Sequence, residues 1–216
     1  MNDKVEKQDD GVESQGSLER RVRADAQRNI DALLQAALAV FTTSGVDAPV
    51  REIAEKAGVG IGTLYRHFPQ RADLVAAVFR REIDACADAA PRLAAEHAPG
   101  AALEKWMQRY AAFMATKRGL AAALHSGNPT FDSLPAYFQA RLLPAFQTLL
   151  DSAVAAGEVR ADVDADDLLT AVAKLCMHTH NEGPDHAQRM IALLVDGLRY
   201  GANFTVKQPS SRRPSP

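Results

Sequence analysis

The chain has 216 residues, 47% of them apolar and 6% aromatic, which suits one large globular domain or two small ones. Its formal net charge of −2 and pI near 6.3 exclude a uniformly basic nucleic-acid binder. The charge is uneven, however, because residues 17–81 hold ten Lys/Arg against seven Asp/Glu, whereas residues 1–16 and 82–216 are both net negative. Phosphates respond to this local sign rather than to the total.

Cys86 and Cys176 lie far apart and show no CxxC spacing, which is typical of free thiols in a reducing compartment. The N-terminus has no apolar signal-peptide core, and no segment approaches about 18 uninterrupted apolar residues. We therefore expect a cytoplasmic protein with no membrane partner.

The predicted elements are helical almost throughout. Residues 1–19 are polar and acidic and residues 206–216 are rich in proline and serine, so both ends are expected to be disordered. Apolar residues at spacings of three and four predict a helix over 28–44, ending at Gly45. Further helical patterns cover 50–57, 61–67, 71–90, 100–117, 133–157 (with Pro144 expected to kink it), 164–180 and 185–204. No alternating run of β-branched residues appears, so the fold class is all-α.

A glycine-rich turn joins the two short helices. Glycine in such a turn sets a second helix across the first, and Gly58 suits the left-handed position that ends the first helix. Gly60 and Gly62 remove side chains where a partner backbone or anion approaches. Donor groups for phosphates and base edges follow on Thr63, Tyr65, Arg66 and His67.

The stretch GVGIGT at 58–63 looks faintly like a nucleotide-binding glycine loop. It follows a helix rather than a strand and lacks the GK[ST] ending, so we reject that interpretation.

The sequence from Ile30 through VFTTSG, REIAEKAGVGIGTLYRHF and RADLVAAVF resembles the N-terminal DNA-binding domain of the TetR family of transcriptional regulators. The resemblance covers residues 28–87, with the helix-turn-helix at about 50–69. It implies a DNA-binding domain at 20–87 and a helical ligand-binding and dimerisation domain at 88–205. The second part resembles the family mainly in length and helical pattern, although AQRMIALLVDGLRYG at 187–201 is similar to the last helix of one subgroup.

The resemblance also implies roles in DNA binding. Gly60, Ile61, Gly62 and Thr63 would face the major groove. Tyr65 and His67 look like the family's phosphate-binding pair. The other implied contacts are with Arg51, Arg66 and Arg71, the last in place of the family's usual lysine, and with arm residues Arg20, Arg21, Arg23 and Arg28.

Two positions depart from the family. The first helix of the motif lacks the usual Ser or Thr cap, and Pro49 suits its first turn instead. Ile61 replaces a residue that is often polar, so it can touch a thymine methyl but cannot read a base by hydrogen bonding. Each DNA-contact residue also has a structural interpretation: surface charge for Arg66 and Arg71, packing for Tyr65, a helix end for His67.

In the second domain an aromatic stripe is the candidate ligand pocket. The spacing also fits core packing, and the family resemblance is what favours a cavity. The candidate residues are Trp106, Tyr110, Phe113, Met114, His125, Tyr137, Phe138 and His178.

The stretch CMHTHNEGPDH at 176–186 is rich in metal-ligand residue types. His178 and His180 point to different helix faces, whereas Cys176 and His180, four apart, could share a zinc ion. A polar helix end explains the same residues, so no metal or other cofactor is assigned.

An enzyme and a helical interaction protein are the competing classes. No nucleophile elbow and no helical HExxH occurs, and the donor cluster at 60–67 argues against a scaffold that does not bind DNA. The sequence therefore predicts a non-enzymatic repressor of the TetR type that binds a palindromic double-stranded DNA operator as a homodimer and is released by a small apolar effector.

Two apolar stripes near the C-terminus predict the dimer interface, as a four-helix arrangement with a second copy. Their members are Leu168, Leu169, Val172, Leu175, Ile191, Leu194, Val195 and Leu198. The alternative is that half of them pack inside the monomer.

Overall fold

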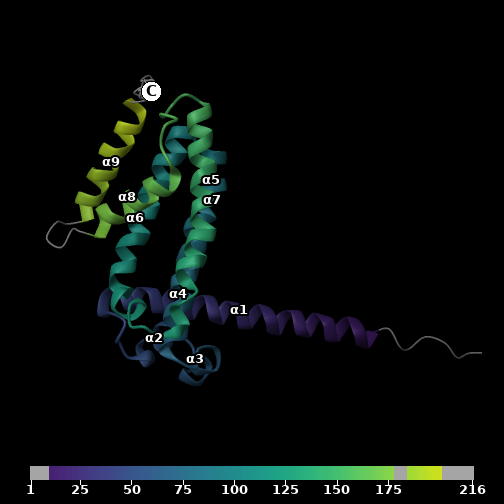
Figure 1. Cartoon of the computed structure of the whole chain (residues 1–216). Helices are drawn as coiled ribbons and strands as arrows, with labels where there is room; N and C mark the ends of the chain where they lie inside the picture. Colours follow the sequence, from purple (N-terminus) through teal and green to yellow (C-terminus); the bar gives the residue numbers. More distant parts are fainter. Residues whose placement is uncertain (1–9, 178–183, 201–216) are drawn as a thin grey trace, which may run out of the picture. The chain divides into compact units, whose positions relative to one another are not determined.

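A computed structural model describes residues 10–177 and 184–200 of the chain, and within them every regular element is helical (Figure 1). The elements are α1 (Asp10–Ser44), α2 (Val50–Ala57), α3 (Ile61–His67), α4 (Arg71–Ala87), α5 (Ala89–Glu96), α6 (Pro99–Leu124), a 3₁₀ turn (Pro129–Phe131), α7 (Leu134–Ala155), α8 (Ala165–Met177) and α9 (Pro184–Tyr200). The all-α prediction is confirmed. Among these described residues, no helix combines the length and apolar character needed to span a bilayer.

Several helix boundaries differ from the sequence prediction, including the end of α6, which lies at Leu124 and not at residue 117. α1 begins at Asp10, although residues up to 19 were expected to be disordered, because the stretch holds no proline and helix propagates readily from a packed segment. The helix expected over 71–90 ends at Ala87, and α5 begins at Ala89. Pro91 therefore lies in the first turn of α5, where its missing N–H leaves no intrahelical bond unmade.

Internal contacts divide the chain into two units. The first runs through Val78 and includes Ala122–Phe131, and the second comprises Phe79–Ala121 and the chain from Asp132 onwards. The division falls inside α4, nine residues before the domain boundary predicted at residue 87, which coincides with the end of that helix.

The core of the first unit is built from the stripes that the sequence shows. Leu33 and Phe41 of α1 are at most 1% exposed, as are Ile53 of α2 and Leu64 of α3. Leu74 of α4 joins them at 0%. Full burial of such side chains contributes about 1.5–3 kcal/mol each, which holds three short helices in place.

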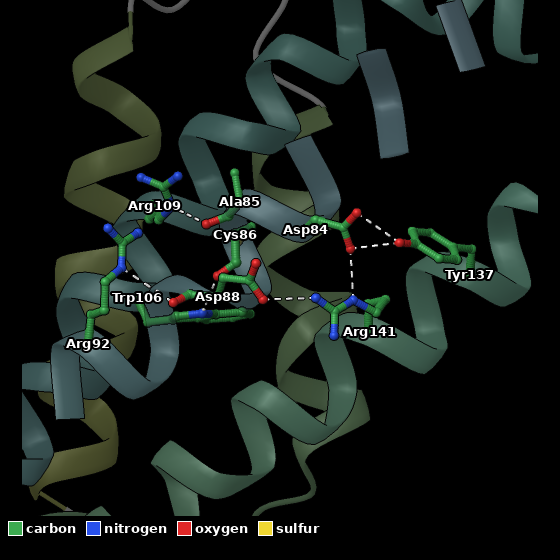
Figure 2. A network of polar contacts seen from close by, with 9 residues as sticks. All are labelled: Asp84, Ala85, Cys86, Asp88, Arg92, Trp106, Arg109, Tyr137 and Arg141. Atoms are coloured by element: carbon green, nitrogen blue, oxygen red, sulfur yellow. Dashed lines mark hydrogen bonds and ion pairs between the residues drawn. The ribbon is translucent and has the colours of Figure 1, made fainter. Parts of the chain in front are cut away.

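The second unit is centred on Trp106, which is fully buried. Its ring stacks on Tyr110 at 5.5 Å and on Phe146 of α7 at 5.2 Å between centroids. Its indole Nε1–H donates to the carbonyl oxygen of Cys86 at 2.9 Å (Figure 2). That carbonyl belongs to the last turn of α4, where it has no intrahelical partner, so α6 completes the end of α4.

A polar network joins α4 to α7 beside this core. The Asp84 carboxylate accepts hydrogen bonds from Tyr137 Oη at 2.7 Å and from Arg141 Nε at 2.8 Å, and Arg141 also pairs with Asp88 at 2.8 Å (Figure 2). Hydrogen bonding to Asp84, with a smaller contribution from burial, raises the pKa of Tyr137. Arg80 lies over the Tyr137 ring at 5.8 Å.

Replacement of Trp106 by phenylalanine keeps a stacked ring but removes the donor to Cys86. We expect Trp106→Phe to lower the free energy of unfolding by about 1–3 kcal/mol, because a buried carbonyl loses its partner and the smaller ring leaves a gap. Urea unfolding followed by circular dichroism measures the change. An unaltered midpoint would show that another donor satisfies the end of α4.

Candidate nucleic-acid interface

α3 is held by a small number of buried side chains. Leu64 is 1% exposed and Phe68, which ends the helix, is 9% exposed. The preceding turn depends on Gly58, whose φ is 69°. Its N–H donates to the carbonyl of Glu55 at 3.1 Å, and the N–H of Val59 donates to Ala54 at 3.0 Å, so the left-handed end predicted for α2 is confirmed.

The opposite face of α3 is exposed and chemically mixed. Ile61 is 42% exposed and Tyr65 is 48% exposed, two of the four large hydrophobic side chains that lie exposed among the described residues. Gly62 and Arg66 are exposed beside them, one helical turn apart. The face thus presents an apolar group, a phenol and a guanidinium from seven residues of helix.

Gly60 and Gly62 have no role in the packing of the chain itself. A Cβ built at either position meets no heavy atom within 4 Å, and Gly60 has an ordinary φ of −68°. Gly100 is the contrast, because a Cβ there would lie 2.4 Å from Glu158 Oε2. The open space above Gly60 and Gly62 is what the close approach of a second molecule requires.

The other predicted DNA contacts are distributed around this face. Thr63 and His67 are half-buried, and Arg51 is exposed near the start of α2. The helix end is Phe68 rather than His67, and Pro49 stands at the N-cap position of α2, one residue before the first turn where the sequence placed it.

Arg71 has a structural contact that the sequence did not indicate. Its Nη1 donates to the carbonyl of Val46 and, at 2.7 Å, to the carbonyl of Ala48. The side chain therefore fixes the turn between α1 and α2, and its predicted contact with DNA stays a prediction.

The arginines of the arm lie along α1. Arg20, Arg23 and Arg28 are exposed, and Arg28 forms an ion pair with Asp25. The side chain of Arg21 lies outside the described residues.

The predicted ligand-pocket residues of α6 are packed against one another. Trp106, Tyr110, Phe113 and Met114 are all at most 5% exposed. Phe138 of α7 closes on the same cluster, with its centroid 6.2 Å from Tyr110 and 6.1 Å from Phe113. A ligand between α6 and α7 at this point would have to part rings that are already in contact.

The remaining predicted pocket residues are scattered. Tyr137 is engaged by Asp84, as described above. His125 is exposed and belongs to the segment Ala122–Phe131 of the first unit. His178 lies outside the described residues.

The predicted dimer-interface residues are mostly buried within one chain. Leu168, Val172, Ile191, Val195 and Leu198 are at most 7% exposed, as is Leu169. Leu175 and Leu194 are half-exposed, and two further side chains of α9, Leu193 and Tyr200, are 63% and 82% exposed. Packing inside the monomer, the alternative that the sequence left open, accounts for the buried ones.

The described residues contain no group of three or more His, Cys, Asp and Glu side chains placed to hold a metal ion. Cys176 is buried, and His180, its suggested partner, lies outside the described part of the chain.

A groove that the sequence did not predict lies between α5 and α6. Its volume is about 530 Å³, and Arg92, Lys105 and Arg109 line it. The i, i+4 spacing of Lys105 and Arg109 was the available signal, since it puts both cations on one helix face.

Comparison with known proteins matches both parts of the chain. The family model described as bacterial regulatory proteins, tetR family, covers residues 33–78. The model described as transcriptional regulator SbtR-like, C-terminal domain, covers residues 98–200. A TetR transcriptional regulator from Streptomyces coelicolor is 38% identical, with a TM-score of 0.68 over 79% of this chain and 98% of that one. The chain belongs to the TetR family of transcriptional regulators.

Other relatives agree with that assignment. A TetR regulator from Mycobacterium vanbaalenii is 35% identical, with a TM-score of 0.68 over 82% of this chain and 99% of that one. A helix-turn-helix transcriptional regulator of Staphylococcus aureus (strain USA300) is 38% identical over 64 residues, 29% of this chain and 35% of that protein. The chain thus matches about a third of the length of such curated relatives. The Mycobacterium smegmatis regulator LfrR, solved in complex with proflavine, shares the fold at 20% identity, with a TM-score of 0.59 over 79% of this chain and 95% of that one.

Alanine substitutions at Gly62 and at Gly58 are expected to have different effects on stability and on DNA binding. Gly62→Ala should leave folding unchanged or gain up to about 1 kcal/mol, because alanine favours helix and its methyl group meets open space. The same change should weaken DNA binding about tenfold or more, because the methyl group fills space that the DNA needs.

Gly58→Ala is the matched control. It should destabilise the fold by about 1–2 kcal/mol, because φ is 69° there. Thermal unfolding and fluorescence anisotropy with labelled DNA separate the two effects. Unchanged DNA affinity in Gly62→Ala would remove this residue from the interface.

Proposed function

We propose that the protein is a repressor that binds a palindromic operator as a homodimer, through the exposed face of α3, and that a small molecule releases it. The observation that carries the proposal is the open space at Gly60 and Gly62 beside the exposed Tyr65 and Arg66. Packing among the described residues does not need this combination, whereas a DNA major groove does: close approach for the backbone, and donors for phosphates and base edges.

Each residue of this face has a part in the proposed complex. Tyr65 and His67 hold phosphates, which positions α3 without reading sequence. Thr63 and Arg66 read base edges, and Ile61, which is 42% exposed, contacts a thymine methyl. Gly60 and Gly62 let the start of α3 enter the DNA major groove, and Arg51 and Arg71 add contacts with the DNA phosphate backbone.

A dimer is the second part of the proposal. Burial inside the chain uses one stripe of α9, and a second stripe with Leu193 and Tyr200 remains exposed. Leu194 of α9 and Leu175 of α8 are half-exposed. These outward side chains of α8 and α9 would form a self-complementary interface with the same surface of a second copy.

Ligand release is the third part. A ligand can lower operator affinity only by as much as it prefers the conformation that does not bind DNA. α4 directly follows α3 in the chain and supplies residues to both units. We propose that a ligand-induced shift at the C-terminal end of α4 reaches α3 along this helix.

The roles on α3 predict different effects of single substitutions. Tyr65→Phe and His67→Ala should weaken binding to every DNA sequence by about tenfold each, since a charge-assisted hydrogen bond to phosphate is lost. Thr63→Ala and Arg66→Ala should also change which sequences bind. Operator selection from random DNA, followed by anisotropy titration at several salt concentrations, measures both properties.

Two results would contradict these roles. One is a change of base preference without loss of affinity in Tyr65→Phe. The other is binding that does not fall with rising salt, because phosphate contacts release counterions. Half-sites in the selected sequences should lie one helical turn, roughly 34–36 Å, or somewhat more apart.

The interface is tested by placing a charge on the exposed stripe of α9. Leu193→Glu and Tyr200→Glu should keep the fold, because both side chains are exposed in the single chain, and should convert a dimer into a monomer. Light scattering at micromolar concentration reads the mass. Ala95→Glu, on an exposed position of α5, is the control and should stay dimeric. A wild-type monomer would reject the dimer and, with it, tight operator binding.

A further inference from the structure

We propose that the groove between α5 and α6 binds an amphipathic anion, a small molecule with an apolar chain or ring that ends in a carboxylate or phosphate. The site is distinct from the aromatic cluster of Trp106 and Tyr110, and it lies wholly within the second unit. The inference rests on the proposed function only for its last step, the effect of this ligand on DNA binding.

Arg92, Lys105 and Arg109 line one groove without forming an ion pair among the residues that the structure describes, as Arg80 and Arg189 elsewhere in the unit also form none. Elsewhere in the second unit Arg141, Arg160 and Arg199 each form an ion pair with an aspartate or glutamate, at 2.5–2.8 Å. The groove thus brings together three of the cations that have no ion pair in the described part of the chain.

The charge balance of the groove favours an anion. Three cationic side chains face it against one carboxylate, that of Glu96, and His97 and Gln108 add further donors. Like charges gathered in this way repel one another until a counter-charge binds. A volume of about 530 Å³ falls within the usual range of small-molecule sites, about 300–1,000 Å³.

The two arginines are held in position by their inner nitrogens. Arg109 Nε donates to the carbonyl of Ala85 at 3.2 Å, and Arg92 Nε donates to the carbonyl of Asp88 at 3.4 Å (Figure 2). The terminal nitrogens of both guanidinium groups stay available to bind the two oxygens of a carboxylate or phosphate. Fixing the guanidinium in advance reduces the side-chain entropy that binding has to remove.

A smaller crevice, partly apolar, shares Arg109 with the groove. Its volume is about 140 Å³, and it is lined by Cys86, Ala112 and Phe113 together with Glu82 and Arg109. Arg109 lines both cavities, and Cys86, Ala112 and Phe113 supply the apolar part of the lining of the crevice.

Two residues that line the crevice are affected by burial. Burial raises the pKa of Cys86 to about 12, and burial also raises the pKa of Glu82 although Arg109 and Arg81 act against it. The apolar groups of the crevice suit the hydrocarbon tail of the ligand, and the cationic side chains of the groove suit its charged head. Transfer of each tail methylene out of water contributes up to about 0.8 kcal/mol.

The test is isothermal calorimetry on the full-length protein at low ionic strength, with octanoate and octyl phosphate as probes. At least one of them should bind, and octanol and acetate should bind at least about tenfold more weakly, because one lacks the charge and the other lacks the tail. Octanol that binds as well as both anions would overturn the proposal.

Variants locate the site. Lys105→Ala and Arg92→Gln should each weaken the anion about threefold to tenfold, since exposed charge pairs are worth less than buried ones. Lys56→Ala, an exposed lysine of α2 outside the groove, is the matched control and should bind as the wild type does. Affinity that is unchanged in Lys105→Ala, Arg92→Gln and their combination would place the anion elsewhere and overturn the proposal.

Operator titration with and without the probe separates this inference from the proposed function. Probe binding that depends on Lys105 but leaves DNA affinity unchanged supports the groove and removes its role in release. Failure of both probes to bind in the groove, together with release of the operator by another small molecule, overturns the groove and leaves the proposed function in place.

Discussion

Burial of one apolar stripe along α4 is the interaction on which both units depend. Leu74, Val75 and Val78 belong to the core of the first unit, and Phe79 and Ile83 belong to the core of the second. All five are at most 4% exposed, so the stripe is continuous across the point at which the contacts divide. α4 therefore contributes buried side chains to the core of each unit.

α3, in contrast to α4, buries few of its side chains. Leu64 is the one buried residue of this helix, and Phe68 follows it, so the remaining side chains are left for a partner. Such a short helix is not stable by itself, and the Gly58 turn and its neighbours α2 and α4 hold it. Exposing Ile61 and Tyr65 is a cost that folding alone does not explain and that binding to DNA does.

The sequence was informative where structure is decided locally. The left-handed turn at Gly58, the two short helices and the all-α class follow from residue types at fixed spacings. It was not informative where a side chain meets a distant partner: Arg71 on the carbonyl of Ala48 joins residues 23 apart in sequence, and Trp106 on Cys86 joins residues 20 apart. The sequence likewise showed one apolar stripe on each of the last two helices without showing how much of each the chain buries itself.

The basic groove belongs to this second kind. From the sequence, Arg92, Lys105 and Arg109 are ordinary surface charges on a chain of net −2. What distinguishes them is that all three line one groove and that none of them forms an ion pair among the described residues. Arg109 also donates to the carbonyl of Ala85, so one side chain both lines the groove and contacts the last turn of α4. The basic groove, through Arg109, and the buried stripe thus both involve α4, the helix that follows α3 in the chain.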